Sequence, residues 1–186
     1  MKSGKFFQTA LVLLLMASAV SVASAQLNSG AQTIALNAKL TESLTLNLSA
    51  NTVSFTLAAG AANNPGSTNI TATTAWVLQP GRTAVGVYAY FTSAAAALTD
   101  GAGDNIPSAD FFISDNGGAS TALTNSVTFS GGQNSGLQLA NVPITGANKN
   151  SNRTDVMAFN INLSSLPQLP ANTYTGTLNI QAQATP

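Results

Sequence analysis

The sequence predicts an all-β protein, a single antiparallel β-sandwich that follows a short leader. Segments in which apolar and polar residues alternate recur along the chain, and loops of Gly, Pro, Asn and Asp separate them. After the leader, no segment shows the periodicity of an amphipathic helix, and no linker divides the chain in two. We therefore expect one sandwich domain over residues 42–186, preceded by a further strand within residues 26–41.

The first 25 residues have the pattern of a secretory signal peptide. Lys2 and Lys5 form a basic start, residues 10–20 are apolar, and residues 23–25 read Ala-Ser-Ala, a small-residue cleavage site. The apolar stretch is short for a bilayer span, so an uncleaved membrane anchor is the weaker alternative. We expect a secreted or cell-surface protein that begins at Gln26 and has no membrane span after cleavage.

The expected strands are short and regularly spaced. They cover residues 33–40, 43–49, 52–57, 69–78, 83–91, 110–114, 125–130, 137–144, 156–164 and 174–184. Gln79 to Arg82 reads Gln-Pro-Gly-Arg, a type II turn sequence, and predicts a hairpin between two adjacent antiparallel strands. Trp76 lies on the same face of its predicted strand as Ile70 and Leu78, so we expect its side chain in the core.

The composition argues against an enzyme and against a nucleic-acid-binding protein. The chain has no His and no Cys, which removes the imidazole base, the thiolate nucleophile and any disulfide. Loss of Lys2 and Lys5 leaves four basic and six acidic side chains, too few basic groups for a phosphate-binding surface. Two carboxylates would suffice for glycoside hydrolysis, but no spacing forces a pair together. We expect no catalysis and no cofactor.

Two weaker patterns leave binding functions open. Asp100, Asp104 and Asn105 supply oxygen ligands of the kind that calcium accepts, although a loop that caps its own backbone accounts for them better. Tyr88 and Tyr90 share one face of the strand at 83–91, where exposed rings would form a platform for a sugar.

The two ends of the predicted domain carry the clearest alternation. The segment Gln-Thr-Ile-Ala-Leu-Asn-Ala-Lys-Leu, residues 32–40, places four apolar side chains on one face: Ile34, Leu36, Ala38 and Leu40. The terminal segment places Tyr174, Leu178 and Ile180 on one face, opposite Thr and Asn side chains. A strand so regular pairs with a sheet edge, in its own molecule or in another.

These two ends resemble secreted bacterial fimbrial subunits and spore-coat-U-type proteins. Residues 170–174 are similar to the Pro-Ala-Gly-Thr-Tyr turn before the last strand of those proteins, with Asn172 in place of Gly. Residues 32–40 resemble the N-terminal extension of pilins. The resemblance implies an immunoglobulin-like or jelly-roll sandwich that lacks one strand and receives it from the next subunit. It implies the chain itself as the main partner, with an assembly chaperone as a further one.

We therefore expect a non-catalytic structural subunit of an extracellular filament or surface coat. Ile34, Leu36, Ala38 and Leu40 would enter a groove beside the terminal strand of a neighbouring copy. The alternatives are a monomeric carbohydrate-binding module with Tyr88 and Tyr90 as its platform, and a calcium-stabilised adhesin domain. An ordinary first strand that completes its own sandwich is the competing interpretation of residues 34–40.

Overall fold

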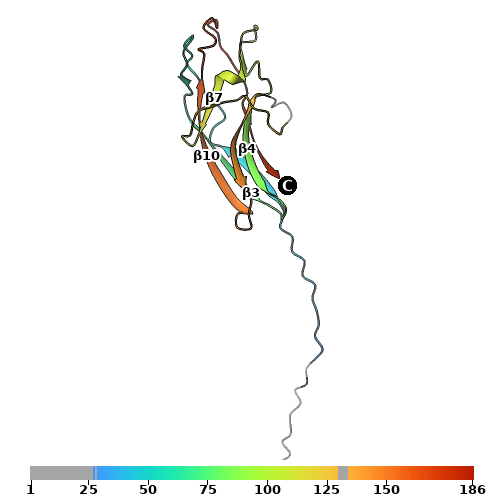
Figure 1. Cartoon of the computed structure of the whole chain (residues 1–186). Helices are drawn as coiled ribbons and strands as arrows, with labels where there is room; N and C mark the ends of the chain where they lie inside the picture. Colours follow the sequence, from blue (N-terminus) through green and yellow to red (C-terminus); the bar gives the residue numbers. More distant parts are fainter. Residues whose placement is uncertain (1–26, 28, 130–133) are drawn as a thin grey trace, which may run out of the picture. The chain divides into compact units, whose positions relative to one another are not determined.

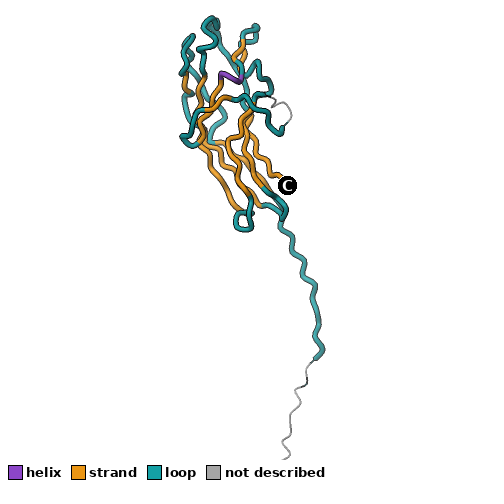
Figure 2. Tube along the Cα trace, in the orientation of Figure 1, coloured by secondary structure: helices purple, strands orange, loops and turns teal. Residues whose placement is uncertain are grey.

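The computed structural model describes residue 27, residues 29–129 and residues 134–186 (Figures 1 and 2). The predicted signal peptide lies outside the described residues. The chain divides into two units between Lys39 and Leu40, and the second unit contains every strand of the described residues. That unit is all-β, with antiparallel sheets packed against each other as in a sandwich.

The larger sheet holds six strands, all antiparallel to their neighbours. Its order is β1 (Ser43–Leu48), β3 (Ile70–Val77), β10 (Asn150–Ile161), β7 (Phe111–Asp115) and β8 (Thr121–Ala122), while β2 (Asn64–Pro65) pairs with the end of β10. Strand β1 is therefore an edge strand, with Ser43 opposite Val77 and Leu48 opposite Ala72.

The second sheet holds three strands in the order β11 (Asn179–Thr185), β4 (Ala84–Tyr90) and β9 (Gly136–Pro143). A separate pair consists of β5 (Leu98–Thr99) and β6 (Asn105–Ile106), and one 3-10 turn, η1, covers Ser108–Asp110. Figure 2 shows this turn as the short helical element among the strands. Like β1, the C-terminal strand β11 pairs on one side and stands at the edge of its sheet.

The core lies between the two sheets and follows the alternation of the sequence. On β3 the side chains of Ile70, Ala72, Thr74 and Trp76 are buried, and on β4 those of Val85, Val87 and Ala89 are fully inaccessible. Trp76 is thus a core residue, as predicted, and its Nε1 donates to the carbonyl oxygen of Asn148 at 2.8 Å. Each large side chain buried in this way stabilises the fold by about 1.5–3 kcal/mol.

A polar layer separates the core into two apolar clusters. Thr74 lies between Ala72 of the larger cluster and Trp76 of the smaller one, opposite Arg153 in register. The Arg153 Nε donates to Asp155 Oδ1 at 2.6 Å, and Asp155 is fully buried. Asp115 Oδ2 lies 3.5 Å from Arg153 Nη2. Burial, followed by the charge of Asp155, raises the pKa of Asp115.

Several predicted strands differ from those observed. The segment 52–57 forms one isolated bridge, Phe55 to Gly66, and the segment 125–130 likewise forms no ladder over its described residues. The terminal ladder begins at Asn179 rather than at Tyr174. Residues 29–41 contain no strand. These segments carry the right alternation, but alternation does not reveal whether a neighbouring edge is present.

The predicted hairpin at Gln79 to Arg82 is wrong. Its turn connects β3 to β4, which belong to different sheets. Before the turn, the Leu78 amide bonds to the Lys149 carbonyl oxygen, which extends the pairing with β10. After the turn, Thr83 bonds to Thr185 and Ile144, next to strands β11 and β9. Gly81 has a positive φ of 104°, so a glycine turn is present, but the chain crosses between layers there.

Candidate assembly site

The segment that precedes β1 is extended and almost completely exposed. The exposed fractions of Ile34, Leu36 and Leu40 are 85%, 89% and 83%, and Ala38 is also exposed. Burial of apolar surface contributes about 25 cal/mol for each Å², so covering this row of side chains would be energetically favourable. These residues pair with no strand of the described chain.

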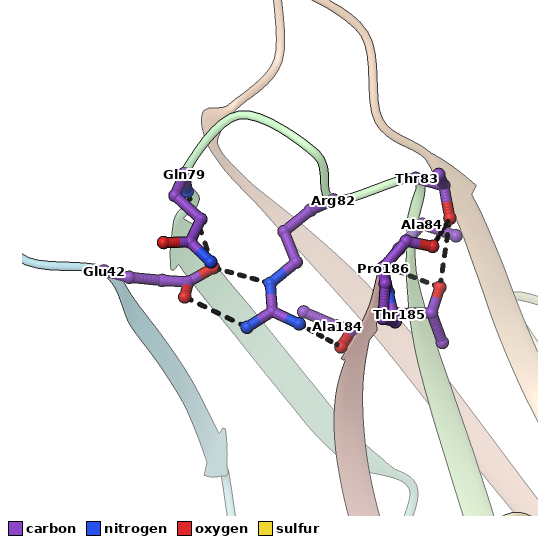
Figure 3. Close-up of polar contacts among 8 residues, drawn as sticks. All are labelled: Glu42, Gln79, Arg82, Thr83, Ala84, Ala184, Thr185 and Pro186. Carbon is purple, nitrogen blue, oxygen red and sulfur yellow. Dashed lines mark hydrogen bonds and ion pairs between the residues drawn. The ribbon is translucent and has the colours of Figure 1, made fainter.

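A salt bridge within the sandwich unit holds Glu42, the residue that precedes β1 (Figure 3). The Arg82 guanidinium donates to both carboxylate oxygens of Glu42, at 2.8 and 3.0 Å, and its Nη1 donates to the Ala184 carbonyl oxygen at 3.3 Å. The hydrogen bond from Arg82 lowers the pKa of Glu42 and raises that of Arg82. Arg82 therefore holds the residue before β1 against the end of β11.

An apolar groove opens between the two sheets, on the side where β1 and β11 are the edge strands. Its volume is about 800 Å³, within the range of about 300–1,000 Å³ usual for ligand pockets. Residues 48–59 form one wall, and their pairing with β3 ends at Leu48. Residues 169–180 form the other wall, and their pairing with β4 begins at Asn179. Core side chains form the floor: Ile70, Phe91, Phe111, Met157, Phe159, Ile161 and Leu163.

The groove is uncharged, with an apolar floor and with walls that carry Asn, Ser and Thr side chains as well as apolar ones. No Asp, Glu, Lys or Arg lines it among the described residues. Tyr174, Leu178 and Ile180, the three residues predicted for an acceptor strand, all line it and are half-buried. The groove thus offers an apolar floor next to the edge strands β1 and β11, of which Leu48 and Ile180 line it.

The first wall is held close to the sheet by a glycine. Ser54 and Ser67 exchange two hydrogen bonds, and Phe55 forms a bridge with Gly66. A Cβ on Gly66 would lie 2.7 Å from Val53 Cγ1, so any larger residue there would force Val53 to shift. Val53, Phe55 and Leu57 thereby turn their half-buried side chains to the groove. The sequence predicted this segment as a strand, but its role as a groove wall was missed.

The second wall is braced by the loop between β5 and β6. Thr99 and Thr175 exchange two backbone hydrogen bonds of 2.9 Å, and Asn172 Nδ2 donates to Asp100 Oδ2 at 3.0 Å. Within the wall, the Tyr174 hydroxyl donates to the Pro170 carbonyl oxygen at 2.8 Å. Burial, with smaller contributions from the charges of Asp104 and Asp100, raises the pKa of Tyr174.

Asp100, a candidate calcium ligand, supports this loop with both carboxylate oxygens. Its Oδ1 accepts hydrogen bonds from the amides of Ala102, Gly103 and Asp104 at 2.8, 3.1 and 3.1 Å. These bonds, that from Ala102 foremost, lower its pKa. Asn105, which the sequence placed beside it, donates instead to the Gly103 carbonyl oxygen. Over the described ranges, no three His, Cys, Asp or Glu side chains are grouped so that they could hold a metal ion.

The candidate sugar platform lies apart from the groove, on the outer face of the three-stranded sheet. Tyr88 and Tyr90 alternate with the inward-facing Val87 and Ala89 of β4, so they point away from the core. Both rings contact Phe129, and both are half-buried. The structure thus brings the predicted acceptor residues into one groove and leaves the tyrosines on a separate surface.

Comparison of the chain with family models, with curated protein sequences and with solved structures found no match. Among the residues that the structure describes, no helix is long and apolar enough to cross a membrane.

Proposed function

We propose that this chain is a non-catalytic, secreted structural subunit of an extracellular filament or surface coat, and that it assembles by β-strand complementation. Residues Ile34 to Leu40 of one copy fill the groove of the next. The observation that carries the proposal is that one chain has both an exposed alternating apolar segment and an apolar groove between two edge strands. The fold is then an immunoglobulin-like sandwich that lacks one strand, as the resemblance to fimbrial subunits implies.

The groove and the segment are complementary in chemistry. The walls end in edge strands, whose free backbone groups can pair with an added strand, and the floor is entirely apolar. Four side chains, those of Ile34, Leu36, Ala38 and Leu40, would face this floor, and the alternating Ala, Asn and Lys would face solvent. Register is set because a shift of one residue would place Asn37 and Lys39 in the groove.

The attachment point of the segment favours a partner in another copy. Glu42 is held by Arg82 beside Ala184, and five residues of β1 separate it from Leu48, where the groove begins. If the segment turned back on itself, residues 34–40 would extend about 20 Å along β1 and end where the groove begins. A reversal at residues 40–42 would also lack the Gly, Pro, Asn or Asp that turns prefer.

Strand donation between copies has a direct structural consequence. The donating segment and the receiving groove are different surfaces of the same chain, so the contact is heterologous and continues from copy to copy. The low charge of the chain offers little repulsion between packed copies. A groove that stays open before assembly exposes apolar surface, which is why an assembly chaperone is a natural second partner of this proposal.

A pair of substitutions on opposite faces of the segment tests the proposal. Leu36→Asp places a charge where the strand would enter the groove, whereas Asn37→Asp places the same charge on the solvent face. Both positions are exposed, so neither change disturbs the fold of a single copy. Electron microscopy should show filaments for the native chain from Gln26 and for Asn37→Asp, and single particles for Leu36→Asp. Filaments of equal length from both variants would refute strand donation.

A further inference from the structure

The outer face of the sheet formed by β11, β4 and β9 has an unusual composition. None of its three strands contains Asp, Glu, Lys or Arg. The residues of β4 that point outward are Gly86, Tyr88 and Tyr90, and they stand between outward-facing glutamines on the neighbouring strands, Gln138 opposite Tyr88 on β9 and Gln181 opposite Tyr88 on β11. The face is therefore uncharged, aromatic at its centre and rich in amides at its flanks.

The aromatic rings of this face form a fixed corner. A Cβ on Gly86 would lie 2.6 Å from the ring of Tyr88, so this ring lies directly on the glycine. The ring of Phe129 stands at 80° to that of Tyr88, with 5.4 Å between centroids. The ring of Tyr90 is stacked with Phe129, at 22° and 5.9 Å. Tyr88 thus forms a floor and Phe129 with Tyr90 a wall, whose geometry is set before any ligand arrives.

Glutamine side chains beside these rings form hydrogen bonds with the two tyrosines and with Thr128. Gln138 Nε2 donates to the Tyr88 hydroxyl oxygen at 3.2 Å, and the Tyr90 hydroxyl donates to Gln181 Oε1 at 3.1 Å. The Thr128 hydroxyl, next to Phe129, donates to Gln183 Oε1 at 2.7 Å. In the hydrogen bonds of the described residues, each glutamine side chain uses one end of its amide, and the other end can serve a ligand.

We infer that this face, which we call the aromatic face site (Tyr88, Tyr90, Phe129, Gln138 and Gln181), binds a neutral polysaccharide. The apolar face of a pyranose ring would stack on Tyr88, and its hydroxyl groups would bond to the two amides. Tyrosine suits this role because it gives a rigid amphipathic contact area at low entropic cost. The lack of charge argues against an anionic glycan, a nucleic acid or a charged peptide, each of which would require a counter-charge.

The aromatic face site is independent of the groove. It uses the outer face of the sheet, whereas the groove opens between the sheets. One such open site binds weakly, but many copies joined in one assembly bind a long polysaccharide with an avidity that can exceed the single-site affinity by about 10²–10⁴-fold. The inference consequently holds for an isolated copy and gains strength in an assembly.

Retention in gels that contain a polysaccharide tests the inference. Native chain from Gln26 and its Leu36→Asp variant, which stays a single copy and enters the gel as one, would be run through gels with dextran, mannan, a soluble cellulose derivative without charge, or anionic alginate. We expect retardation by at least one neutral polymer and none by alginate. Tyr88→Ala should weaken the apparent affinity about tenfold or more, equivalent to about 1.4 kcal/mol. The matched control is Phe112→Ala, which removes a half-buried ring from a strand of the other sheet.

The exposed amides give a second variant that leaves the rings and the core in place. Gln138→Ala combined with Gln181→Ala should lower retention while the melting temperature stays unchanged, so loss of binding is separated from loss of fold. Leu36→Asp should be retained as a single copy, which separates this site from assembly. Failure of every neutral polymer to retard the native chain would overturn the inference. Equal retention of Tyr88→Ala, the double glutamine variant and Phe112→Ala would overturn it as well.

Discussion

At the scale of single residues, the polar layer is the least expected feature of the core. Thr74, Asp115, Arg153 and Asp155 lie between two apolar clusters. Three of their side-chain oxygens are buried and have no hydrogen-bond partner among the residues that the structure describes: Thr74 Oγ1, Asp115 Oδ1 and Asp155 Oδ2. Removing Asp155 would leave Arg153 without its main partner. The cost should stay below the about 3–5 kcal/mol of a fully buried pair, because Arg153 remains about a third exposed.

Asp115 gives a testable pH dependence. Burial and the neighbouring Asp155 raise its pKa in the folded state, so the folded protein binds the proton more tightly than the unfolded chain does. The ordinary pKa of Asp115 is near 3.8. As the pH rises from there through the raised pKa of the folded state, ionisation of Asp115 lowers the free energy of unfolding. Asp115→Asn should increase the free energy of unfolding at pH 7 and change it little at pH 3. Urea unfolding at both pH values measures this difference.

The exposed Asp104 supplies the control for that measurement, because its side chain lies on a loop outside the polar layer. Asp104→Asn should leave the difference between pH 3 and pH 7 close to that of the native chain. If Asp115→Asn instead lowers stability at pH 7, the attraction of Asp115 to Arg153 outweighs the repulsion and desolvation described above.

At the scale of elements, the groove depends on a wall that is not part of a ladder. Residues 169–178 are held by hydrogen bonds to Thr99 and to Asp100. At Gly176 the wall comes so close to Ala97 that an added Cβ would meet the Ala97 carbonyl oxygen. The hydrogen bonds that Asp100 accepts in the loop lower its pKa. Their contribution to stability is therefore fully present above the ordinary pKa of Asp100 and is lost as the pH falls through the lowered pKa. The second wall should thus loosen in acid.

Asp100→Ala should have the same effect at neutral pH. The substitution removes the acceptor of three loop amides and of Asn172, so the second wall loses its side-chain brace. We expect faster hydrogen exchange at the Thr175 amide, which bonds to Thr99, and shorter filaments. Asp104→Ala, which removes none of these bonds, is the matched control. Unchanged exchange at Thr175 in Asp100→Ala would show that the backbone pair alone holds the wall.

The elements that the sequence predicted well are those whose alternation coincides with burial on one face. The alternation in β3 correctly placed Ile70 and Trp76 in the core, and Tyr174, Leu178 and Ile180 do share one surface. The errors arise where pairing depends on distant edges. Pro80 and Gly81 favour a turn locally, but the sheet that receives the next strand is decided by β9 and β11. Likewise, the alternation of Val53 and Phe55 could not show that their segment borders a groove.

At the scale of the whole molecule, the chain has an apolar groove, an exposed apolar segment and very little charge. The composition of the full sequence includes only six basic and six acidic side chains and no cysteine, so neither repulsion nor a disulfide restrains association. A single copy therefore exposes apolar surface both at its groove and along residues 34–40. The proposed strand donation would cover both surfaces in one contact, and their burial would favour the assembled state.

Disulfide trapping between copies tests strand donation most directly, because the native chain has no cysteine. Asn37→Cys would be combined with Thr173→Cys or Thr177→Cys, exposed positions on the second wall. Residues opposite each other on paired strands lie about 4.5–5.5 Å apart, within reach of a disulfide. After mild oxidation, strand donation between copies predicts a ladder of covalent multimers on a non-reducing gel. A single band of internally cross-linked monomer would show that the segment fills its own groove, and would contradict strand donation between copies.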